Sequence, residues 1–234
     1  MIRIIGPIFL LGAAFISFSQ TKNSPKVTVS TPPSVQNQTN SEHNTSPPSK
    51  PKKIFIALGD SLTEGYQLSS QEAYPHLLEA RLNKEFPRYK TQVINAGISG
   101  STTSSGVNRL KKYLRLKPHV VFISLGSNDG LRGTPIDTIK KNLQNMIDLA
   151  RSNNILVILA GLKIPMNYGE EYTEAFERIF KSLAQKNNVT YIPFLLEGVA
   201  GNPDLNLPDL IHPNGKGHKV MTETIYPYFR KFYN

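Results

Sequence analysis

Residues 55–66 read FIALGDSLTEGY, and this stretch decides how the chain begins to fold. The apolar run over 54–58 has no polar alternation, which is typical of a buried β-strand. It stops at Gly59-Asp60-Ser61 and gives way to small polar residues, which indicates a sharp turn into a helix at the edge of a sheet. Ser61 is then the N-cap of that helix, with Glu64 completing a capping box, or a reactive hydroxyl, and one serine could fill both roles.

The alternation of apolar run and amphipathic segment continues to the C-terminus. Apolar or β-branched runs predict strands at 54–58, 91–97, 119–126, 155–161 and 189–194. Helical spacing of apolar residues predicts helices at 71–86, 106–116, 138–153, 170–188 and 216–232. Because continuous apolar strands are covered on both faces and strand–helix alternation gives parallel pairing, we expect an α/β fold. Its architecture would be a three-layer α/β/α, doubly wound, flavodoxin-like sheet of about five parallel strands.

The first 53 residues do not follow this alternation. Residues 1–19 hold one arginine and an apolar run over 4–18, a length that fits a secretory signal peptide and is short for a membrane-spanning helix. Residues 20–53 are almost all Ser, Thr, Pro, Asn, Gln and Lys, which predicts a disordered tether. We expect export by a cleaved signal, with an uncleaved N-terminal anchor as the alternative, and a folded domain over 54–234.

Composition narrows the classes of function. The chain has no cysteine, which excludes disulfides, thiolate metal sites and a cysteine nucleophile. Its net charge is +10, but residues 54–234 mix 21 Lys/Arg with 16 acidic residues and show no basic stripe with interleaved aromatics. We therefore expect no nucleic-acid partner, and at most a weak attraction to an anionic membrane surface. Metal and nucleotide motifs are absent from the sequence, so no cofactor is expected, and nothing in it indicates an oligomeric state.

Residues that carry chemistry follow the predicted strands. In an open parallel sheet, active sites lie outside the carboxyl ends of the strands. Ser61 follows the first strand, Gly97 the second and Asn128 the third. The loop PDLIHPNGKGH, before the last helix, contributes Asp209 and His212. Parallel pairing places the first three residues at one edge of the sheet, and the last loop can reach the same edge.

The serine, histidine and aspartate in this set fit acyl transfer. A serine hydroxyl is a weak nucleophile and needs a base, for which His212 is the candidate. The imidazole in turn needs a carboxylate that fixes its tautomer, and Asp209 stands three residues before it. His218, in the last predicted helix, is expected to be a surface or capping group. The rival carboxylates are farther from His212 in the sequence, namely Glu197 and Asp204.

Donors for an oxyanion are also present at the strand ends. An attacked carbonyl becomes an oxyanion, which requires hydrogen-bond donors already in place. The backbone N–H groups of Ser61 and Gly97 are two such donors, and glycine leaves room for a substrate. The side chain of Asn128 supplies a third N–H, whereas an aspartate at that position would repel the oxyanion.

Four blocks in this order resemble the SGNH (GDSL) hydrolase family: GDS, the glycine of NAGISG, the asparagine of GSND and the DLIH pair. The sequence looks most like the branch of bacterial thioesterase I, lysophospholipase L1 and arylesterase, over nearly all of residues 54–234. The resemblance implies Ser61 as nucleophile, His212 as general base and Asp209 as the residue that orients it. It also implies an oxyanion hole formed by Ser61, Gly97 and Asn128. The long polar segment in front departs from the family pattern.

We therefore expect a serine esterase that hydrolyses acyl, aryl or lysophospholipid esters, or thioesters, through an acyl-enzyme. The acyl chain is expected to lie against apolar residues of the loops after the third and fourth strands, namely Leu131, Ile164, Pro165, Met166 and Tyr168. One alternative is a carbohydrate O-acetyl esterase with the same triad. An alternative from another class is a non-catalytic lipid- or glycan-binding module.

Overall fold

A five-stranded parallel sheet forms the centre of the computed structural model, which describes residues 49–233. Its strands are β1 (Lys52–Gly59), β2 (Lys90–Gly97), β3 (Val120–Ser124), β4 (Leu156–Ala160) and β5 (Thr190–Ile192). The order across the sheet is β2-β1-β3-β4-β5, and every neighbouring pair is parallel. The strand order reverses at β1, so the sheet is doubly wound, as expected.

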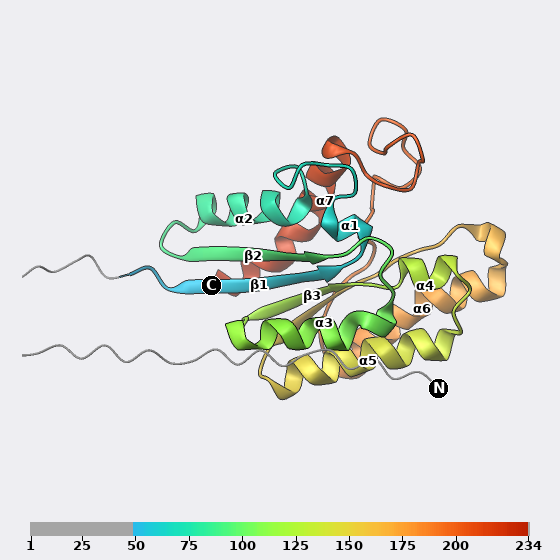
Figure 1. Cartoon of the computed structure of the whole chain (residues 1–234), viewed down its shortest axis with the longest axis horizontal. Coiled ribbons are helices and arrows are strands. Elements are labelled where there is room, and N and C mark those ends of the chain that lie inside the picture. The colour runs from blue at the N-terminus through green and yellow to red at the C-terminus, as the bar shows by residue number, and fades with distance from the viewer. Residues whose placement is uncertain (1–48, 234) are drawn as a thin grey trace, which may run out of the picture. The chain divides into compact units, whose positions relative to one another are not determined.

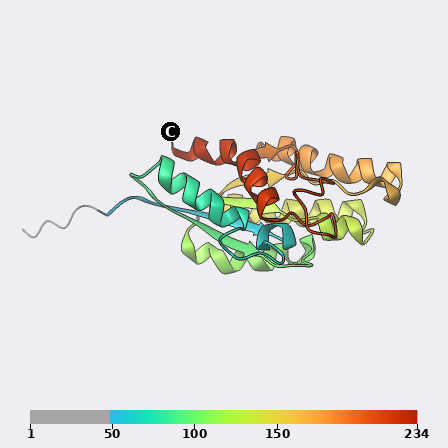
Figure 2. The same cartoon turned by 90° about the horizontal axis from the view of Figure 1, so that it is seen from above.

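Helices cover both faces of the sheet, which confirms the three-layer architecture (Figures 1 and 2). One face carries α2 (Tyr74–Glu85) and α7 (Gly215–Arg230), and the other carries α3 (Gly106–Tyr113), α5 (Ile136–Ser152) and α6 (Glu170–Asn187). Crossovers that leave β1 in opposite directions place their helices on opposite faces. The remaining elements are short: α1 (Ser61–Glu64), α4 (Ser127–Leu131), η1 (Thr103–Ser105), η2 (Leu114–Leu116), η3 (Met166–Tyr168) and η4 (Lys231–Tyr233).

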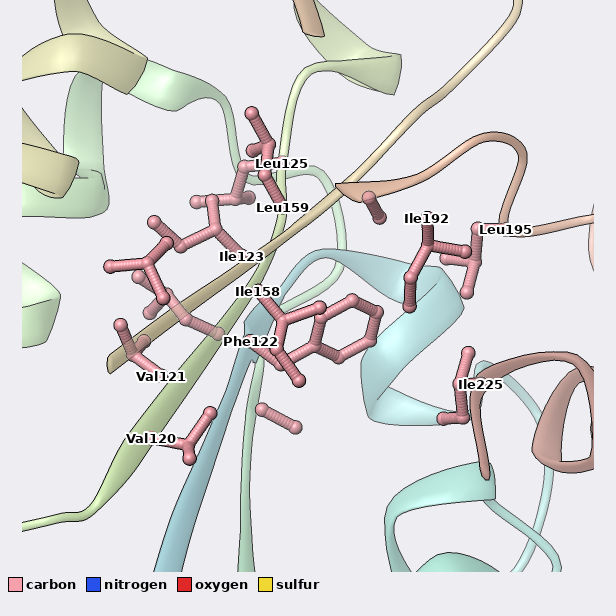
Figure 3. Packing of buried hydrophobic residues seen from close by; sticks show 14 of the residues in the cluster. Val120, Val121, Phe122, Ile123, Leu125, Ile158, Leu159, Ile192, Leu195 and Ile225 are labelled. Carbon is pink, nitrogen blue, oxygen red and sulfur yellow. The ribbon is translucent and has the colours of Figure 1, made fainter. Parts of the chain in front are cut away.

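The hydrophobic core lies on both faces of the sheet around its central strand, β3. All five residues of β3 are buried, as its uninterrupted apolar sequence predicts. Figure 3 shows that their side chains alternate, with Val121 and Ile123 on one face and Phe122 on the other, toward Ile225 of α7. These side chains are fully buried. Such packing makes the sheet a rigid platform for the loops at its carboxyl edge.

Three local features differ from the predicted boundaries. β1 begins at Lys52 because Lys52 and Lys53 pair with the start of β2, so these two residues belong to the sheet and not to the tether. The helix predicted from residue 71 begins at Tyr74, with Pro75 in its first turn. The helix α4 was not predicted. The expected leader, and the tether up to residue 48, lie outside the described residues. Over residues 49–233, no helix has both the length and the hydropathy that crossing a bilayer requires.

Candidate active site

The turn after β1 exposes Ser61 at the carboxyl edge of the sheet. Asp60 is the N-cap of α1, and its Oδ1 accepts a hydrogen bond from the N–H of Leu62 at 3.1 Å. Gly59 permits this turn because a Cβ there would lie 1.9 Å from Thr63 Oγ1. The alternative that Ser61 caps the helix is therefore wrong, since Asp60 fills that role and leaves the serine hydroxyl free for other partners.

Ser61, His212 and Asp209 form one hydrogen-bonded chain. The Nε2 atom of His212 lies 3.0 Å from Ser61 Oγ, and its Nδ1 lies 2.7 Å from Asp209 Oδ2. Within residues 49–233, the carboxylate that contacts this imidazole is Asp209, and not Glu197 or Asp204. A carboxylate at Nδ1 fixes the tautomer in which Nε2 can accept the serine proton.

The Asp209 carboxylate is held by backbone as well as by the imidazole. Its Oδ1 accepts hydrogen bonds from the N–H groups of Ile211 and His212, each at 3.0 Å. Partial burial raises the pKa of Asp209, but the hydrogen bonds from His212 and Ile211 outweigh it and leave that pKa below its usual value. Asp209 is therefore ionised at neutral pH and oriented before any substrate binds.

Tyr66 lies against the imidazole, which the sequence did not lead us to expect. The two ring centroids are 4.5 Å apart, with an angle of 39° between the ring planes. The backbone N–H of Tyr66 also donates to the carbonyl of Ser61 at 3.2 Å, so the tyrosine is tied to the α1 turn. The ring position follows from the left-handed Gly65 (φ 84°), which reverses the chain after α1.

The three expected oxyanion donors lie at the same edge, but two of them have protein acceptors. The N–H of Ser61 is in the first turn of α1 and has no acceptor within the helix. The N–H of Gly97 donates to the side-chain oxygen of Asn95 at 2.9 Å, and the amide of Asn128 donates to the carbonyl of Ser101 at 3.1 Å. A substrate oxyanion would replace these two acceptors.

Gly97 is required by the packing of α1 on the end of β2. A Cβ at Gly97 would lie 2.1 Å from the backbone nitrogen of Glu64. The Glu64 carboxylate also accepts a hydrogen bond from the N–H of Ser99 at 2.8 Å, so α1 contacts the loop after β2 as well as the end of β2. Glu64 thus binds the loop after β2 instead of completing a capping box.

Asp60 is a buried carboxyl group beside the reacting residues. Its side chain is completely buried, and burial raises its pKa to about 6, although the Leu62 N–H and the nearby His212 and Arg109 act in the opposite direction. Asp60 therefore changes charge near pH 6, directly beside the reacting residues.

Arg109 on α3 joins the ends of two strands, a role that its position in an amphipathic helix did not reveal. Its guanidinium is buried and donates to the carbonyl of Gly59 at 2.8 Å and also to the carbonyl of Ala96. Burial lowers the pKa of Arg109. Gly59 precedes the Asp60–Ser61 turn and Ala96 precedes Gly97, so one cation connects the two segments that carry backbone donors.

The expected acyl-chain residues lie at the same edge, with one exception. Leu131, Met166 and Tyr168 are 36%, 63% and 39% exposed, and Pro165 is exposed as well. The Tyr168 hydroxyl donates to the carbonyl of Leu131 at 3.0 Å, so the loops after β3 and β4 are joined. Ile164 differs from the expectation: only 7% of it is exposed, because it packs beneath Gly130 in the core.

We expected His218 to be a surface or a capping group; it is not at the surface, and it accepts the hydrogen bond of the first N–H of α2. It is fully buried in the first part of α7, where its Nδ1 accepts a hydrogen bond from the N–H of Tyr74 at 3.1 Å. Burial lowers the pKa of His218 to about 4. Within the part of the chain that the structure describes, no cluster of three or more His, Asp or Glu residues is arranged to hold a metal ion.

Comparison with known proteins identifies the relatives of this chain. It is 37% identical over 176 residues to esterase TesA of Pseudomonas aeruginosa (75% of this chain, 87% of that protein). It is 36% identical over 178 residues to an arylesterase of Vibrio mimicus (76% and 88%). It is 38% identical over 161 residues to thioesterase 1/protease 1/lysophospholipase L1 of Escherichia coli K12 (68% and 75%).

The fold is shared with solved structures. The crystal structure of TesA matches 76% of this chain and 99% of its own, with a TM-score of 0.73 and 36% identity. The model of the GDSL-like lipase/acylhydrolase family matches residues 57–220, which span every residue of the candidate site. The resemblance that the sequence blocks suggested is thereby confirmed, and the chain belongs to the GDSL-like lipase/acylhydrolase family.

Proposed function

We propose that this chain hydrolyses carboxylic esters and thioesters through an acyl-enzyme on Ser61. The observation that carries the proposal is the hydrogen-bonded chain from Ser61 Oγ through the His212 imidazole to Asp209. Nε2 takes the proton of Oγ while Oγ attacks the acyl carbon, and a tetrahedral intermediate forms. The imidazolium then gives this proton to the leaving alcohol or thiol, which departs and leaves the acyl-enzyme.

Water completes the cycle by the same route. A water molecule loses a proton to His212 Nε2 and attacks the acyl carbon, after which the imidazolium returns the proton to Ser61 Oγ and the acid is released. The carboxylate of Asp209 stabilises the imidazolium in both halves and remains ionised throughout. The triad therefore needs no other proton carrier, and we expect no cofactor.

The oxyanion of each intermediate is proposed to bind the N–H groups of Ser61 and Gly97 and the amide of Asn128. A charged oxygen is a stronger acceptor than an amide oxygen, so it would take the Gly97 N–H from Asn95 and an Asn128 N–H from Ser101. A ground-state carbonyl competes less well for the same donors. This difference favours the transition state over the bound substrate.

The substrate class follows from the relatives and from the exposed apolar side chains. The relatives are named for esterase, arylesterase, thioesterase and lysophospholipase activities. Leu131, Met166 and Tyr168 form an open apolar surface that would accept acyl or aryl groups of different lengths. We propose a small-molecule or lipid ester as substrate, and no nucleic-acid partner.

The test is hydrolysis of p-nitrophenyl esters by wild type and by Ser61→Ala. Wild type should turn over, and Ser61→Ala should lose about 10³-fold or more in kcat, as triad enzymes do when the nucleophile is removed. Full turnover by Ser61→Ala would overturn the proposal. Saturable binding of ester without release of nitrophenol by wild type would indicate the non-catalytic module.

An acyl series from acetate to palmitate separates an acetyl esterase, which acts on acetate alone, from an enzyme of longer acyl chains.

We also propose that residues 1–19 are an export signal and that residues 20–51 tether the catalytic domain. The support is the sequence pattern of these residues. Mass spectrometry of the protein isolated from its host decides between the alternatives. A mature chain that begins near Gln20 supports cleavage, and a chain that begins at Met1 supports the uncleaved anchor.

A further inference from the structure

The amino edge of the sheet, opposite the candidate active site, carries a dense group of basic residues. The segment that enters β1 contributes Lys50, Lys52 and Lys53. The end of α2 and the turn into β2 contribute Lys84, Arg88 and Lys90. The end of α3 and the turn into β3 contribute Lys111, Lys112, Arg115 and Lys117. Over these three segments, 49–53, 84–90 and 111–117, the one acidic residue is Glu85.

The sheet topology brings these segments together. In the order β2-β1-β3, the strands that the three segments enter are neighbours. Lys52 is directly opposite Lys90 in the parallel register, and the N–H of His119 donates to the carbonyl of Ile54 at 2.8 Å where β3 joins β1. The C-terminal residues Arg230 and Lys231 lie at the same edge, because Tyr233 stacks on Phe86 at the end of α2. We call these three segments, with Arg230 and Lys231, the basic end (Figure 1).

The charges of the basic end are available to a partner. All of these Lys and Arg side chains except Lys53, which is partly buried, are exposed. Within residues 49–233, the ion pair made by the basic end joins Arg230 to Glu85, at 3.7 Å. The loops at the opposite, carboxyl edge have the reverse charge: segments 60–72, 126–137, 161–174 and 193–216 hold eleven acidic and three basic residues. The domain is therefore electrically polarised along the strand direction.

Exposed leucines distinguish a lipid surface from other anionic partners. Leu116, between Arg115 and Lys117, is 37% exposed, and Leu156, the first residue of β4, is 57% exposed. Exposed leucines among cations suit the boundary between headgroups and acyl chains, whereas a nucleic-acid backbone offers them nothing.

We propose that the basic end docks the domain on an anionic lipid bilayer, with the candidate active site facing away from that surface. Lys and Arg side chains gathered on one surface bind anionic headgroups, at about 1 kcal/mol for each cation near the bilayer. The acidic edge around Ser61 is repelled by the same bilayer, so the orientation is set by both ends. Substrate then reaches the site from the aqueous side, and not from the bilayer on which the domain is docked.

The experiment measures sedimentation of the domain from residue 49 with vesicles of phosphatidylcholine and with vesicles containing 30% phosphatidylserine. This part folds alone, since its core lies within residues 54–233 and the TesA structure is matched over 99% of its length by 76% of this chain. Wild type should bind only the anionic vesicles at 0.1 M salt. Binding should fall more than tenfold at 1 M salt, where the Debye length shortens from about 10 Å to about 3 Å.

A matched pair of variants tests the surface itself. Lys111→Glu/Lys112→Glu/Arg115→Glu should lose more than 100-fold in affinity for anionic vesicles, because each lost cation lowers it about fivefold. Lys140→Glu/Lys141→Glu/Lys219→Glu changes the net charge equally but alters exposed residues outside the basic end, and it should lose less than tenfold. Both should hydrolyse p-nitrophenyl acetate like wild type. Equal losses in the two variants, or tighter binding of wild type to double-stranded DNA than to the anionic vesicles, would overturn the proposal.

Orientation is measured independently, without removing any charge. Because the chain has no cysteine, single cysteines can carry an environment-sensitive fluorophore. Ser49→Cys places the label at the basic end, and Thr138→Cys places it at the opposite edge, on the first turn of α5. Anionic vesicles should shift the emission of the label at residue 49 to the blue and leave the label at residue 138 unchanged. The reverse pattern, or equal shifts, would contradict the proposed orientation.

Discussion

Asp60 and Ser61 are adjacent in the sequence but occupy opposite environments. Asp60 is fully buried and caps α1, whereas Ser61 directs its hydroxyl toward His212. The residue types and their spacing were enough to predict the partners of Ser61, because acyl transfer requires a base and a carboxylate in a known relation. Nothing in that chemistry specifies an aromatic ring, so Tyr66 was found only from the structure.

Tyr66 should assist catalysis through its ring. The imidazolium that forms in the transition state lies against the electron-rich tyrosine ring, an interaction that contributes about 0.5–1 kcal/mol at exposed sites. Tyr66→Leu should therefore lower kcat about two- to fivefold with little change in KM, as measured by steady-state hydrolysis of p-nitrophenyl esters. Tyr66→Phe keeps the ring and should retain wild-type kcat. Equal losses in both variants would assign the effect to the hydroxyl and contradict this role.

At the scale of elements, the strands, the long helices and the turn from β1 into α1 were predictable, but the contacts that join these elements to one another were not. Continuous apolar sequence identifies β3 and β4, and helical spacing identifies α5 and α6, because burial on a regular element leaves a periodic pattern. Short elements such as α1 and α4 have no such period. Their position depends on contacts between residues far apart in the sequence, such as Glu64 with Gly97, which no local pattern encodes.

Gly97→Ala tests the joint between α1 and β2. The new Cβ would lie 2.1 Å from the Glu64 nitrogen and 2.6 Å from its Cα, and backbone cannot move aside as a flexible side chain can. We expect a loss of about 2–3 kcal/mol in the free energy of unfolding, together with at least a tenfold loss of kcat. Gly215→Ala is the control, since its Cβ would meet only the Glu72 side chain, and it should change stability by less than about 1 kcal/mol. Urea unfolding of both variants measures the difference, and equal stability would contradict it.

Arg109→Lys tests the joint between β1 and β2. A lysine cannot donate to the Gly59 and Ala96 carbonyls with the fixed geometry of a guanidinium, so the backbone donors of Ser61 and Gly97 lose their alignment. We expect about a tenfold lower kcat with KM changed less than twofold, at a temperature where the variant is fully folded. Arg81→Lys, on α2 against the Tyr226 ring, is the control and should leave kcat unchanged. If Arg109→Lys raises KM and keeps kcat, Arg109 does not position the donors.

At the scale of the whole molecule, the reacting residues and the cluster of basic residues lie at opposite edges of the sheet. The carboxyl edge of the sheet gathers the reacting residues, and this placement was predictable because parallel strands end together. The gathering of cations at the amino edge was not predicted, although every one of those residues is visible in the sequence. The sequence does not reveal this cluster, because basic segments from the amino edge alternate along the chain with acidic loops from the carboxyl edge. The parallel sheet brings the basic segments together at one end of the domain and the acidic loops together at the other.

The dependence of stability on pH is also a property of the whole domain, because two buried groups on different elements oppose one another. His218 has a pKa lowered to about 4 by burial, so as pH falls from 6.5 to 4 the unfolded chain gains a proton that the folded chain lacks, and stability decreases by about 3 kcal/mol. Asp60 has a pKa raised to about 6 by burial. As pH falls from 6 to 4, the folded chain therefore gains the proton, and stability increases by about 3 kcal/mol.

These two contributions should nearly cancel in wild type, so its free energy of unfolding should fall only slightly between pH 6.5 and 4. The remaining decrease comes from His119 and Glu72, whose pKa values are also lowered in the folded chain, by burial and by hydrogen bonds from Ser69 respectively. Each single replacement should leave the pH dependence that the other group contributes. Asp60→Asn should become less stable as pH falls through this range, and His218→Asn, whose side-chain oxygen can still accept the Tyr74 N–H, should become more stable. The double replacement should have the same shallow pH dependence as wild type. Urea unfolding at a series of pH values measures all four proteins. Parallel curves for wild type and both single variants would show that neither group titrates as its burial requires.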